Sequence, residues 1–312
     1  DGSFSRLKPT VAIVTNIDAE HLDHHGSFEN LETAFENFIT SIPFYGFAAL
    51  CIDHPSVQKL LPAASDRRVI TYGLSANADV RAVNLRHEAG QMLFDVQLSD
   101  RLEIAVDRLE DVQFPMLGEH NVQNCLAAIS ICLEMALDPA VILSGLRQFK
   151  GVGRRFDFKG ETDGITIIDD YGHHPVEIRA ALSAGRMRAE QNKLIAVVQP
   201  HRYTRLRDLF SDFCACFNDA DHVIVSDVYA AGEAPIEGFE RDDLVEGLRA
   251  WGHRSVHAMQ DPSHLAAQIN DLATSGDLVM CLGAGTVTQW ASSLPQELAL
   301  LRSASPDKEA GE

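Results

Sequence analysis

The first half of the chain alternates short apolar runs with a longer segment of helical periodicity. Val11–Val14 and the later runs Phe47–Ile52 and Arg68–Tyr72 are short and apolar, which predicts strands, the first of them buried. Between the first two, apolar side chains recur every three or four positions from Phe28 to Ile42, as on one face of a helix. From Val80 to Val106 apolar and polar residues alternate, which predicts a small antiparallel patch.

Two helical segments close the first half, Asn121–Leu137 and Pro139–Phe149. Asp138 and Pro139 form the break between them, because proline fits the first turn of a helix but not its interior. The pair of glycines at Gly151 and Gly153 then precedes a new series of strands. A chain of 312 residues is long enough for two cores. The expected domains are residues 1–151 and 152–312.

The second half repeats strand and helix in turn. Strands are predicted at Ile165–Ile168, Leu194–Val198, His222–Ser226 and Asp277–Leu282. Helices are predicted near 175–188, 203–218, 240–251 and 262–273. Such alternation favours a parallel sheet that helices cover on both faces. The fold class is therefore α/β.

Composition narrows the function classes. Lys and Arg number 26 against 45 Asp and Glu, a net charge of −19, which speaks against general nucleic-acid binding because phosphate neutralisation needs a basic surface. The apolar runs are far shorter than the ~20 residues of a membrane span. We see no secretory leader and no CxxC pair among the six cysteines, and therefore expect a cytoplasmic protein with reduced thiols.

Ionisable side chains crowd the segment after the first strand. Glu20, His21 and Asp23 could supply oxygen and imidazole ligands to a divalent ion. A solvated loop that caps a helix is the alternative. A hydrolytic metal site built on His21, His24 and His25 is a further hypothesis, although the spacing matches no familiar metal motif.

A second polar group opens the helix predicted from residue 121. Asn121 and Asn124 are three positions apart and share one face of that helix. Either could be the N-cap. Because an amide both donates and accepts hydrogen bonds, the pair could instead read the edge of a purine.

Basic side chains gather in one stretch, although the chain is acidic overall. Nine of the twenty arginines lie between Arg147 and Arg207. Arg154 and Arg155 follow the boundary glycines, where they are either anion ligands or surface cations. Arg202 and Arg205 lie three apart at a helix start and can converge on one carboxylate or phosphate. Since cations at that end oppose the helix dipole, we expect an anion to compensate them.

The segment Asp169–Pro175 is the clearest candidate site. It places two carboxylates, the phenol of Tyr171 and the imidazoles of His173 and His174 directly after a predicted strand. Packing does not explain such a group. By contrast, the Leu282–Thr286 segment contains only GxG, which is a weak dinucleotide signal, and close packing is the better explanation for its glycines.

Together these motifs resemble the Mur ligases, most closely the branch that joins L-alanine to UDP-N-acetylmuramate. The matching blocks occur in the family's order: VTNIDAEHLD (14–23), FENLETAFENF (28–38), GEHNVQNCLAA (118–128), GVGRRFDF (151–158), DDYGHHP (169–175), QPHRYTRLRDL (199–209) and GEAPI (232–236). The related branch that attaches recycled peptide to the same sugar nucleotide carries Phe-Ala in place of Tyr171-Gly172, and its arginine block lacks the HRYTR form.

The resemblance implies a fold and a reaction. The fold would be part of the ATP-binding central domain followed by a Rossmann-like C-terminal domain. ATP and Mg²⁺ would convert the carboxylate of UDP-N-acetylmuramate into an acyl phosphate, which the amine of L-alanine attacks. His21 would be a magnesium ligand, Asn121 and Asn124 would approach the adenine, Arg155 the ATP phosphates and Asp170 the ribose. The L-alanine carboxylate and the reacting centre would be surrounded by Tyr171, His173, His201, Arg202 and Arg205.

The sequence departs from the family at its N-terminus. The family's UDP-binding domain and its Gly-rich phosphate loop have no counterpart in these 312 residues. We therefore expect the chain by itself to be inactive. A peptide-recycling ligase and a non-catalytic fragment that binds nucleotide or amino acid are the alternative functions.

Overall fold

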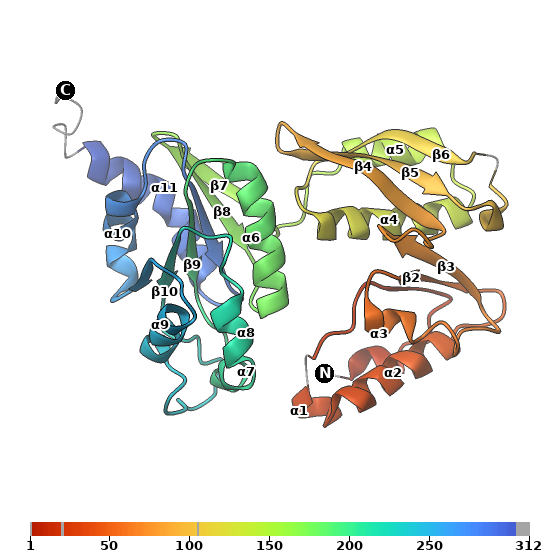
Figure 1. The fold of residues 1–312 in the computed structure, drawn as a ribbon, viewed down its shortest axis with the longest axis horizontal. Helices are drawn as coiled ribbons and strands as arrows, with labels where there is room; N and C mark the ends of the chain where they lie inside the picture. Colours follow the sequence, from red (N-terminus) through yellow and green to blue (C-terminus); the bar gives the residue numbers. More distant parts are fainter. Residues whose placement is uncertain (1, 20–21, 105, 304–312) are drawn as a thin grey trace. The chain divides into compact units, whose positions relative to one another are not determined.

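The computed structural model describes residues 2–19, 22–104 and 106–303. The chain forms two compact units, Asp1–Phe149 and Lys150–Glu312, and each is built around its own sheet (Figure 1).

The sheet of the first unit joins a parallel part to an antiparallel part, in the order β1-β2-β3-β4-β5-β6. Its strands are β1 (Val11–Val14), β2 (Phe47–Cys51), β3 (Arg68–Gly73), β4 (Val80–Glu88), β5 (Gln91–Leu98) and β6 (Arg108–Phe114). β1, β2 and β3 pair in parallel, and β4, β5 and β6 form an antiparallel meander. The antiparallel patch predicted between residues 80 and 106 is therefore confirmed, and it extends the parallel strands because β4 also pairs with β3.

Local sequence signals set the helices of this unit. Ser27 caps α2 by accepting a hydrogen bond from the Asn30 N–H, and Asp138 caps α5 through the Ala140 N–H, with Pro139 in its first turn. The helical elements are η1 (Ser3–Arg6), α1 (Leu22–His25), α2 (Phe28–Thr40), α3 (Pro55–Gln58), η2 (Asp100–Leu102), α4 (Glu119–Glu134) and α5 (Pro139–Arg147). α2 and α3 pack on β1 and β2 around one apolar core, while α4 contacts β2, β3 and β4.

The second unit contains a mostly parallel sheet in the order β11-β10-β9-β12-β8-β7. Its strands are β7 (Asp157–Thr162), β8 (Ile165–Asp170), β9 (Leu194–Val198), β10 (His222–Val225), β11 (Val256–Ala258) and β12 (Leu278–Leu282). β7 alone among these strands runs antiparallel to its neighbour. β8, β9 and β12 are buried along their whole length, as expected for strands covered on both faces.

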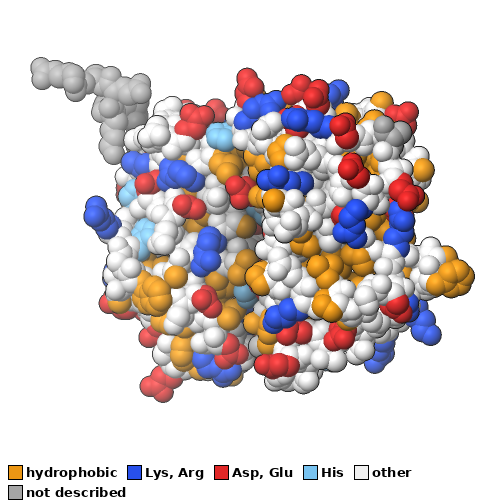
Figure 2. Space-filling model, turned by 45° about the vertical axis from the view of Figure 1, so that its right-hand side comes forward, with side chains coloured by type: hydrophobic (Ala, Val, Ile, Leu, Met, Phe, Trp, Pro, Cys, Tyr) orange, Lys and Arg blue, Asp and Glu red, His pale blue; other side chains and the backbone are white. Residues whose placement is uncertain are grey.

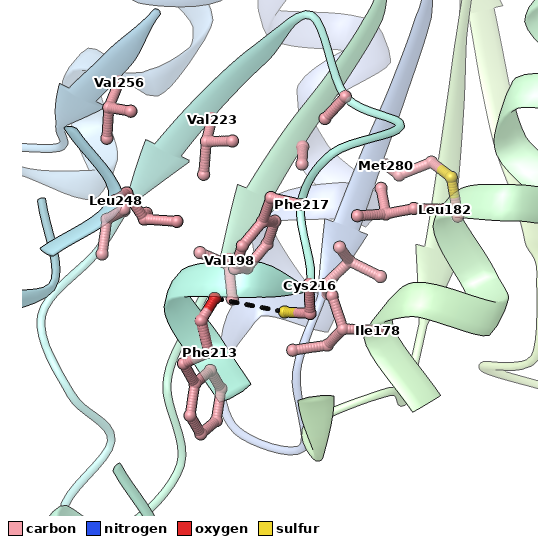
Figure 3. Close-up of a cluster of buried hydrophobic side chains, with 14 of the residues drawn as sticks. Ile178, Leu182, Val198, Phe213, Cys216, Phe217, Val223, Leu248, Val256 and Met280 are labelled. Atoms are coloured by element: carbon pink, nitrogen blue, oxygen red, sulfur yellow. Dashed lines mark hydrogen bonds between the residues drawn. The ribbon is translucent and has the colours of Figure 1, made fainter. Parts of the chain in front are cut away.

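Helices cover both faces of this sheet, which confirms the predicted parallel α/β architecture. They are α6 (Pro175–Ala189), α7 (Tyr203–Asp208), α8 (Phe210–Ala215), α9 (Arg241–Ala250), η3 (Pro262–His264), α10 (Leu265–Leu272) and α11 (Val287–Ser303). On one face, side chains of α6, α8 and α9 pack against the strands, and Figure 3 shows Phe217 between Val223 and Ile178, with Phe213 below it. α10 and α11 cover the other face.

The structure corrects the sequence prediction in several elements. The helix predicted at 203–218 is two short helices, α7 and α8, which meet at Leu209. β7, β11 and α11 were not predicted. β7 was missed because it lies at the sheet edge, is partly exposed and lacks an apolar run. β11 was missed because it has only three residues, and α11 because it contains Pro295. Pro295 fits because its ring lies against Gly160 of β7, and its carbonyl accepts a hydrogen bond from the Thr162 hydroxyl.

The structure also shows the state of the cysteines and the distribution of charge on one face of the surface. The six cysteines are free, and all but Cys132 are buried. Among the described residues, no helix is both long and apolar enough to cross a membrane. Figure 2 shows acidic and basic side chains interspersed on the face in view.

Candidate functional site

The predicted site residues of the second unit lie where parallel strands end and their helices leave toward opposite faces. β8 and β9 continue into α6 and α7, and the helices of that face cover one side of the sheet. β12 lies between β8 and β9 but continues into α11, which packs on the other side. In open α/β sheets ligands bind outside the carboxyl ends of strands at such a switch point. The topology therefore favours this edge as the site.

Two glycines after β12 let the neighbouring turns approach closely. A Cβ atom at Gly283 would lie 2.8 Å from the Gln199 carbonyl oxygen, and one at Gly285 would lie 2.4 Å from Gln199 Oε1 and 2.7 Å from the Tyr229 ring. The Gln199 amide also accepts from the Val287 N–H and donates to the Thr286 hydroxyl. Close approach is thus the reason for the glycines, as predicted, but the partners are the turns after β9 and β10 as well as the helix.

Asp170 joins two segments of backbone. Its carboxylate accepts one hydrogen bond from the Gly172 N–H and one from the Phe156 N–H, both 2.8 Å long. The side chain is buried, and burial raises its pKa although the two hydrogen bonds oppose the rise. Asp170 therefore fastens the turn after β8 to the segment before β7.

The Arg154 side chain is bound by other groups of the protein. Its guanidinium donates to the Gly283 carbonyl at 2.7 Å, lies 4.7 Å from the centre of the Tyr171 ring and 3.7 Å from the Asp169 carboxylate. Asp169 is fully buried and accepts a 2.6 Å hydrogen bond from the Thr288 hydroxyl. Arg154 thus links the turns after β8 and β12.

Arg155 is more open to solvent, with its side chain 45% exposed. It lies 5.5 Å from the Tyr171 ring and 3.6 Å from Glu177. The Glu177 carboxylate accepts the backbone N–H groups of His173 and His174 and closes a capping box at the start of α6. Burial would raise the pKa of Glu177, but hydrogen bonds from His173 and the charge of Arg155 lower it to about 2. Glu177 is therefore a fixed anion beside two predicted site residues.

Aromatic rings line this edge in a row. The Tyr171 and His173 ring centres are 5.1 Å apart, those of His173 and His201 5.7 Å, and those of His201 and Tyr229 5.4 Å, the last pair stacked at 13°. Burial, together with the nearby charge of Arg205, lowers the pKa of His201 to about 4. His201 is consequently neutral at pH 7, and the arginines carry the positive charge.

A carboxylate lies at the start of α7, the short helix that carries Arg205 and Arg207 in its last turn. Glu233 accepts the Thr204 N–H at 3.0 Å and the Thr204 hydroxyl at 2.7 Å, in the first turn of the helix. Arg205 donates to the His201 carbonyl at 3.2 Å, and its guanidinium lies 3.3 Å from His201 Nδ1. Arg202 precedes the helix with φ 70°. Glu233 thus places one of the protein's own carboxylates beside the first turn of α7.

The predicted amide pair lies in the first unit. Gly118 precedes α4, so neither Asn121 nor Asn124 is the N-cap. Asn121 is buried and donates to the Leu117 carbonyl at 2.8 Å, whereas Asn124 is exposed. Between them Gln123 donates to the Asp53 carboxylate at 2.7 Å.

The carboxyl ends of β1 and β2 bring together further polar side chains. Asn16 donates to Asp18 at 2.8 Å, and His54 Nε2 lies 3.5 Å from the same carboxylate. His21 lies outside the described residues. Within the described ranges, no group of three His, Cys, Asp or Glu side chains is arranged to hold a metal.

Comparison with known proteins identifies the family. Residues 2–132 match the family described as Mur ligase middle domain, and residues 154–285 match the Mur ligase, glutamate ligase domain. The chain belongs to the Mur ligase family. A UDP-N-acetylmuramate–L-alanine ligase of Granulibacter bethesdensis is 55% identical over 305 residues, which cover 98% of this chain and 63% of that protein. One of Gluconobacter oxydans is 56% identical over 301 residues, or 96% and 63% of the two chains.

Solved Mur ligase structures share the fold. The UDP-N-acetylmuramate-alanine ligase of Thermotoga maritima superposes with a TM-score of 0.76 at 22% identity, covering 98% of this chain and 62% of that one. The murein peptide ligase of Psychrobacter arcticus gives a TM-score of 0.62 at 20% identity, covering 95% and 59%. This Mur ligase chain therefore spans somewhat less than two thirds of the relatives that it matches.

The structure gathers part of the predicted set and adds to it. Tyr171, His173 and His201 lie in one row, with Arg205 against His201, and Arg155 against Tyr171. The sequence reasoning gave no role to Glu177, Tyr229 or Glu233. The GEAPI block contained Glu233, but only the fold shows that this carboxylate meets α7.

Proposed function

We propose that the polypeptide carrying these residues joins L-alanine to UDP-N-acetylmuramate with hydrolysis of ATP. What carries the proposal is the likeness of nearly the whole chain, at 54–56% identity, to curated relatives named for this reaction. The row of Tyr171, His173 and His201 beside Arg205, at the switch point of the second unit, supports an amino-acid site there.

The reaction would have two steps. The γ-phosphoryl group of ATP passes to the carboxylate of UDP-N-acetylmuramate, giving an acyl phosphate and ADP. The amine of L-alanine then attacks the acyl carbon, the amide bond forms, the amine loses a proton and phosphate leaves. Negative charge on phosphoryl and carboxyl oxygens rises in both steps, so fixed positive groups are the natural stabilisers.

The residues of the second unit would divide this work. Arg202 and Arg205 would bind the L-alanine carboxylate, because two guanidinium groups on one turn can each form charge-assisted hydrogen bonds. His201 is neutral at pH 7, so it would orient the substrate by hydrogen bonding without adding charge. Tyr171 and His173 would complete the amino-acid site. Arg155 would reach the ATP phosphates, and Asp170 would hold the ribose side through the turn that it fastens.

Nucleotide and magnesium would occupy the first unit. Asn121 and Asn124 would approach the adenine. The side chains after β1 offer the Asp18 carboxylate, the Asn16 amide and, from the sequence, His21. This oxygen-rich but incomplete set fits Mg²⁺, which keeps several waters and binds through one or two carboxylates plus substrate phosphates. Bound Mg²⁺ would neutralise phosphate charge.

The test is phosphate release by the polypeptide that carries these 312 residues in the cell. We expect turnover that requires ATP, Mg²⁺, UDP-N-acetylmuramate and L-alanine together. Arg205→Ala should raise the KM for L-alanine at least about tenfold, the equivalent of one lost charged hydrogen bond, and leave the KM for UDP-N-acetylmuramate within about twofold. Equal changes in both KM values would contradict the assignment.

The same assay separates the alternatives. A peptide-recycling ligase would accept a peptide whose first residue is L-alanine in preference to the free amino acid. A non-catalytic module would bind ATP and Mg²⁺ in calorimetry without turnover. For the 312-residue chain alone we propose no ligase activity, and clear turnover by it would refute that part.

A further inference from the structure

The segment after β10 is fastened to the segment after β9 at several points. The Tyr229 N–H donates to the Pro200 carbonyl at 2.8 Å, and the Arg202 N–H donates to the Tyr229 carbonyl at 2.9 Å. His201 and Tyr229 form a parallel bridge beyond the ends of their strands, and their rings stack. We call Tyr229–Glu233 the strap. Tyr229, the first residue of the strap, therefore holds the backbone around His201 in place and stacks on the His201 ring.

The other end of the strap holds α7. Glu233 accepts two hydrogen bonds from Thr204, which lies between Arg202 and Arg205. Burial would raise the pKa of Glu233, but the hydrogen bonds from Thr204 and the charge of Arg202 lower it, so the group is anionic at neutral pH. A carboxylate here offsets two positive side chains and the positive end of the helix.

The backbone at Arg202 shows why such fastening is needed. Arg202 has φ 70° and ψ 134°, a conformation that a residue with a Cβ atom adopts only at a cost in free energy. Strain of this kind persists where the surrounding structure holds it. The strained residue is held by its own N–H, which donates to the Tyr229 carbonyl, and by the bonds to Glu233 from Thr204, two positions farther along.

We propose that Tyr229 and Glu233 are positioning residues of the amino-acid site. Tyr229 sets the place of the His201 ring, and Glu233 sets the first turn of α7 with Arg202 and Arg205. The effect of these two residues on the KM for L-alanine rests on the proposed function. Neither residue needs to touch the substrate, because both act through side chains that do.

Ligase kinetics of the whole polypeptide give the first test. Tyr229→Ala and Glu233→Gln should each raise the KM for L-alanine about tenfold, the loss of roughly 1.4 kcal/mol of binding. The KM values for ATP and UDP-N-acetylmuramate should stay within about twofold. Tyr229→Phe keeps the stacked ring and should restore the wild-type KM. Glu237→Gln, an exposed glutamate four positions beyond the strap, is the matched control and should change nothing.

A second measurement does not depend on activity. In NMR pH titration the His201 ring of the wild type should titrate near pH 4, and Tyr229→Ala should move the midpoint up toward 6.5, because the ring then gains water. Parallel changes in all three KM values, or a His201 midpoint unmoved in Tyr229→Ala, would overturn the proposal. If the wild type showed no L-alanine-dependent turnover, the proposed function would fail, and the titration alone would decide the positioning of His201.

Discussion

Replacing Glu177 by glutamine removes one charge and keeps an acceptor. The carboxylate accepts the N–H groups of His173 and His174 at 3.1 and 3.3 Å, and it lies 3.2 Å from His173 Nδ1 and 3.6 Å from Arg155. Glutamine at this third helical position can still close a capping box. Glu177→Gln therefore isolates the electrostatic part of the interaction.

The magnitude follows from the pKa of Glu177, which falls from 4.5 to about 2 in the folded protein. The difference, 4.5 − 2, is about 2.5 pH units, and at about 1.4 kcal/mol per unit the upper bound is roughly 3 kcal/mol. The side chain is 31% exposed, so water screens part of this attraction. We expect Glu177→Gln to lower the free energy of unfolding by about 1–2 kcal/mol at pH 7.

The pH dependence gives the sharper test. A carboxylate whose pKa is lower in the folded state stabilises the protein above the unfolded pKa, and this contribution disappears as the pH falls through the folded value. In urea unfolding the difference between wild type and Glu177→Gln should be full at pH 7 and less than about half of that at pH 3. Glu161→Gln, on exposed β7, is the control. A difference that stays constant from pH 7 to pH 3 would refute the electrostatic reasoning.

Two further substitutions test the core and the close approach at the site. Phe213→Ala should lower the free energy of unfolding by about 3–5 kcal/mol, because the ring is fully buried, whereas Phe158→Ala at an exposed position should cost under about 1 kcal/mol; similar losses in urea unfolding would contradict this. Gly285→Ala should cost about 1–3 kcal/mol and reduce ligase turnover, since its methyl group displaces Gln199 or Tyr229. Gly145→Ala, with open space around it, should not destabilise the protein, and equal effects of the two glycine substitutions would argue against the clash.

The sequence predicts the buried part of the fold better than its edges. Leu194–Val198 matches β9 residue for residue, because a buried strand is a continuous apolar run between polar turns. Val11–Val14 also matches the bounds of β1, but the prediction that this strand is buried is wrong, since β1 lies at the sheet edge and its Ile13 side chain is exposed. The sequence does not predict β7 and β11, because these edge strands are half-exposed or short and so lack a long apolar run. Pro295 argues against a helix in the sequence, whereas in the structure α11 tolerates this proline because the neighbouring strand β7 leaves room for its ring at Gly160.

For the site, the sequence predicts residues but not their partners. His173 and His201 stand out because each follows a strand, and both meet at one sheet edge in the structure. Nothing local assigns Tyr229 to the ring of His201 or Glu233 to Thr204, because those contacts depend on the lateral order of β9 and β10. Likewise Arg154 and Arg155 are adjacent in sequence, yet only the fold shows that Arg154 is bound to the Gly283 carbonyl.

The distribution of charge connects these observations. A net charge of −19 describes the whole chain, whereas the arginines of the site have acids of their own close by. Arg154 lies near Asp169, Arg155 near Glu177, and the charge of Arg202 lowers the pKa of Glu233. These acids are fixed by backbone hydrogen bonds or by burial, so they hold the guanidinium groups in place before any substrate arrives. Recognition of an anion here would depend on this preorganisation, because fixed, already oriented donors lose less entropy on binding than free side chains do.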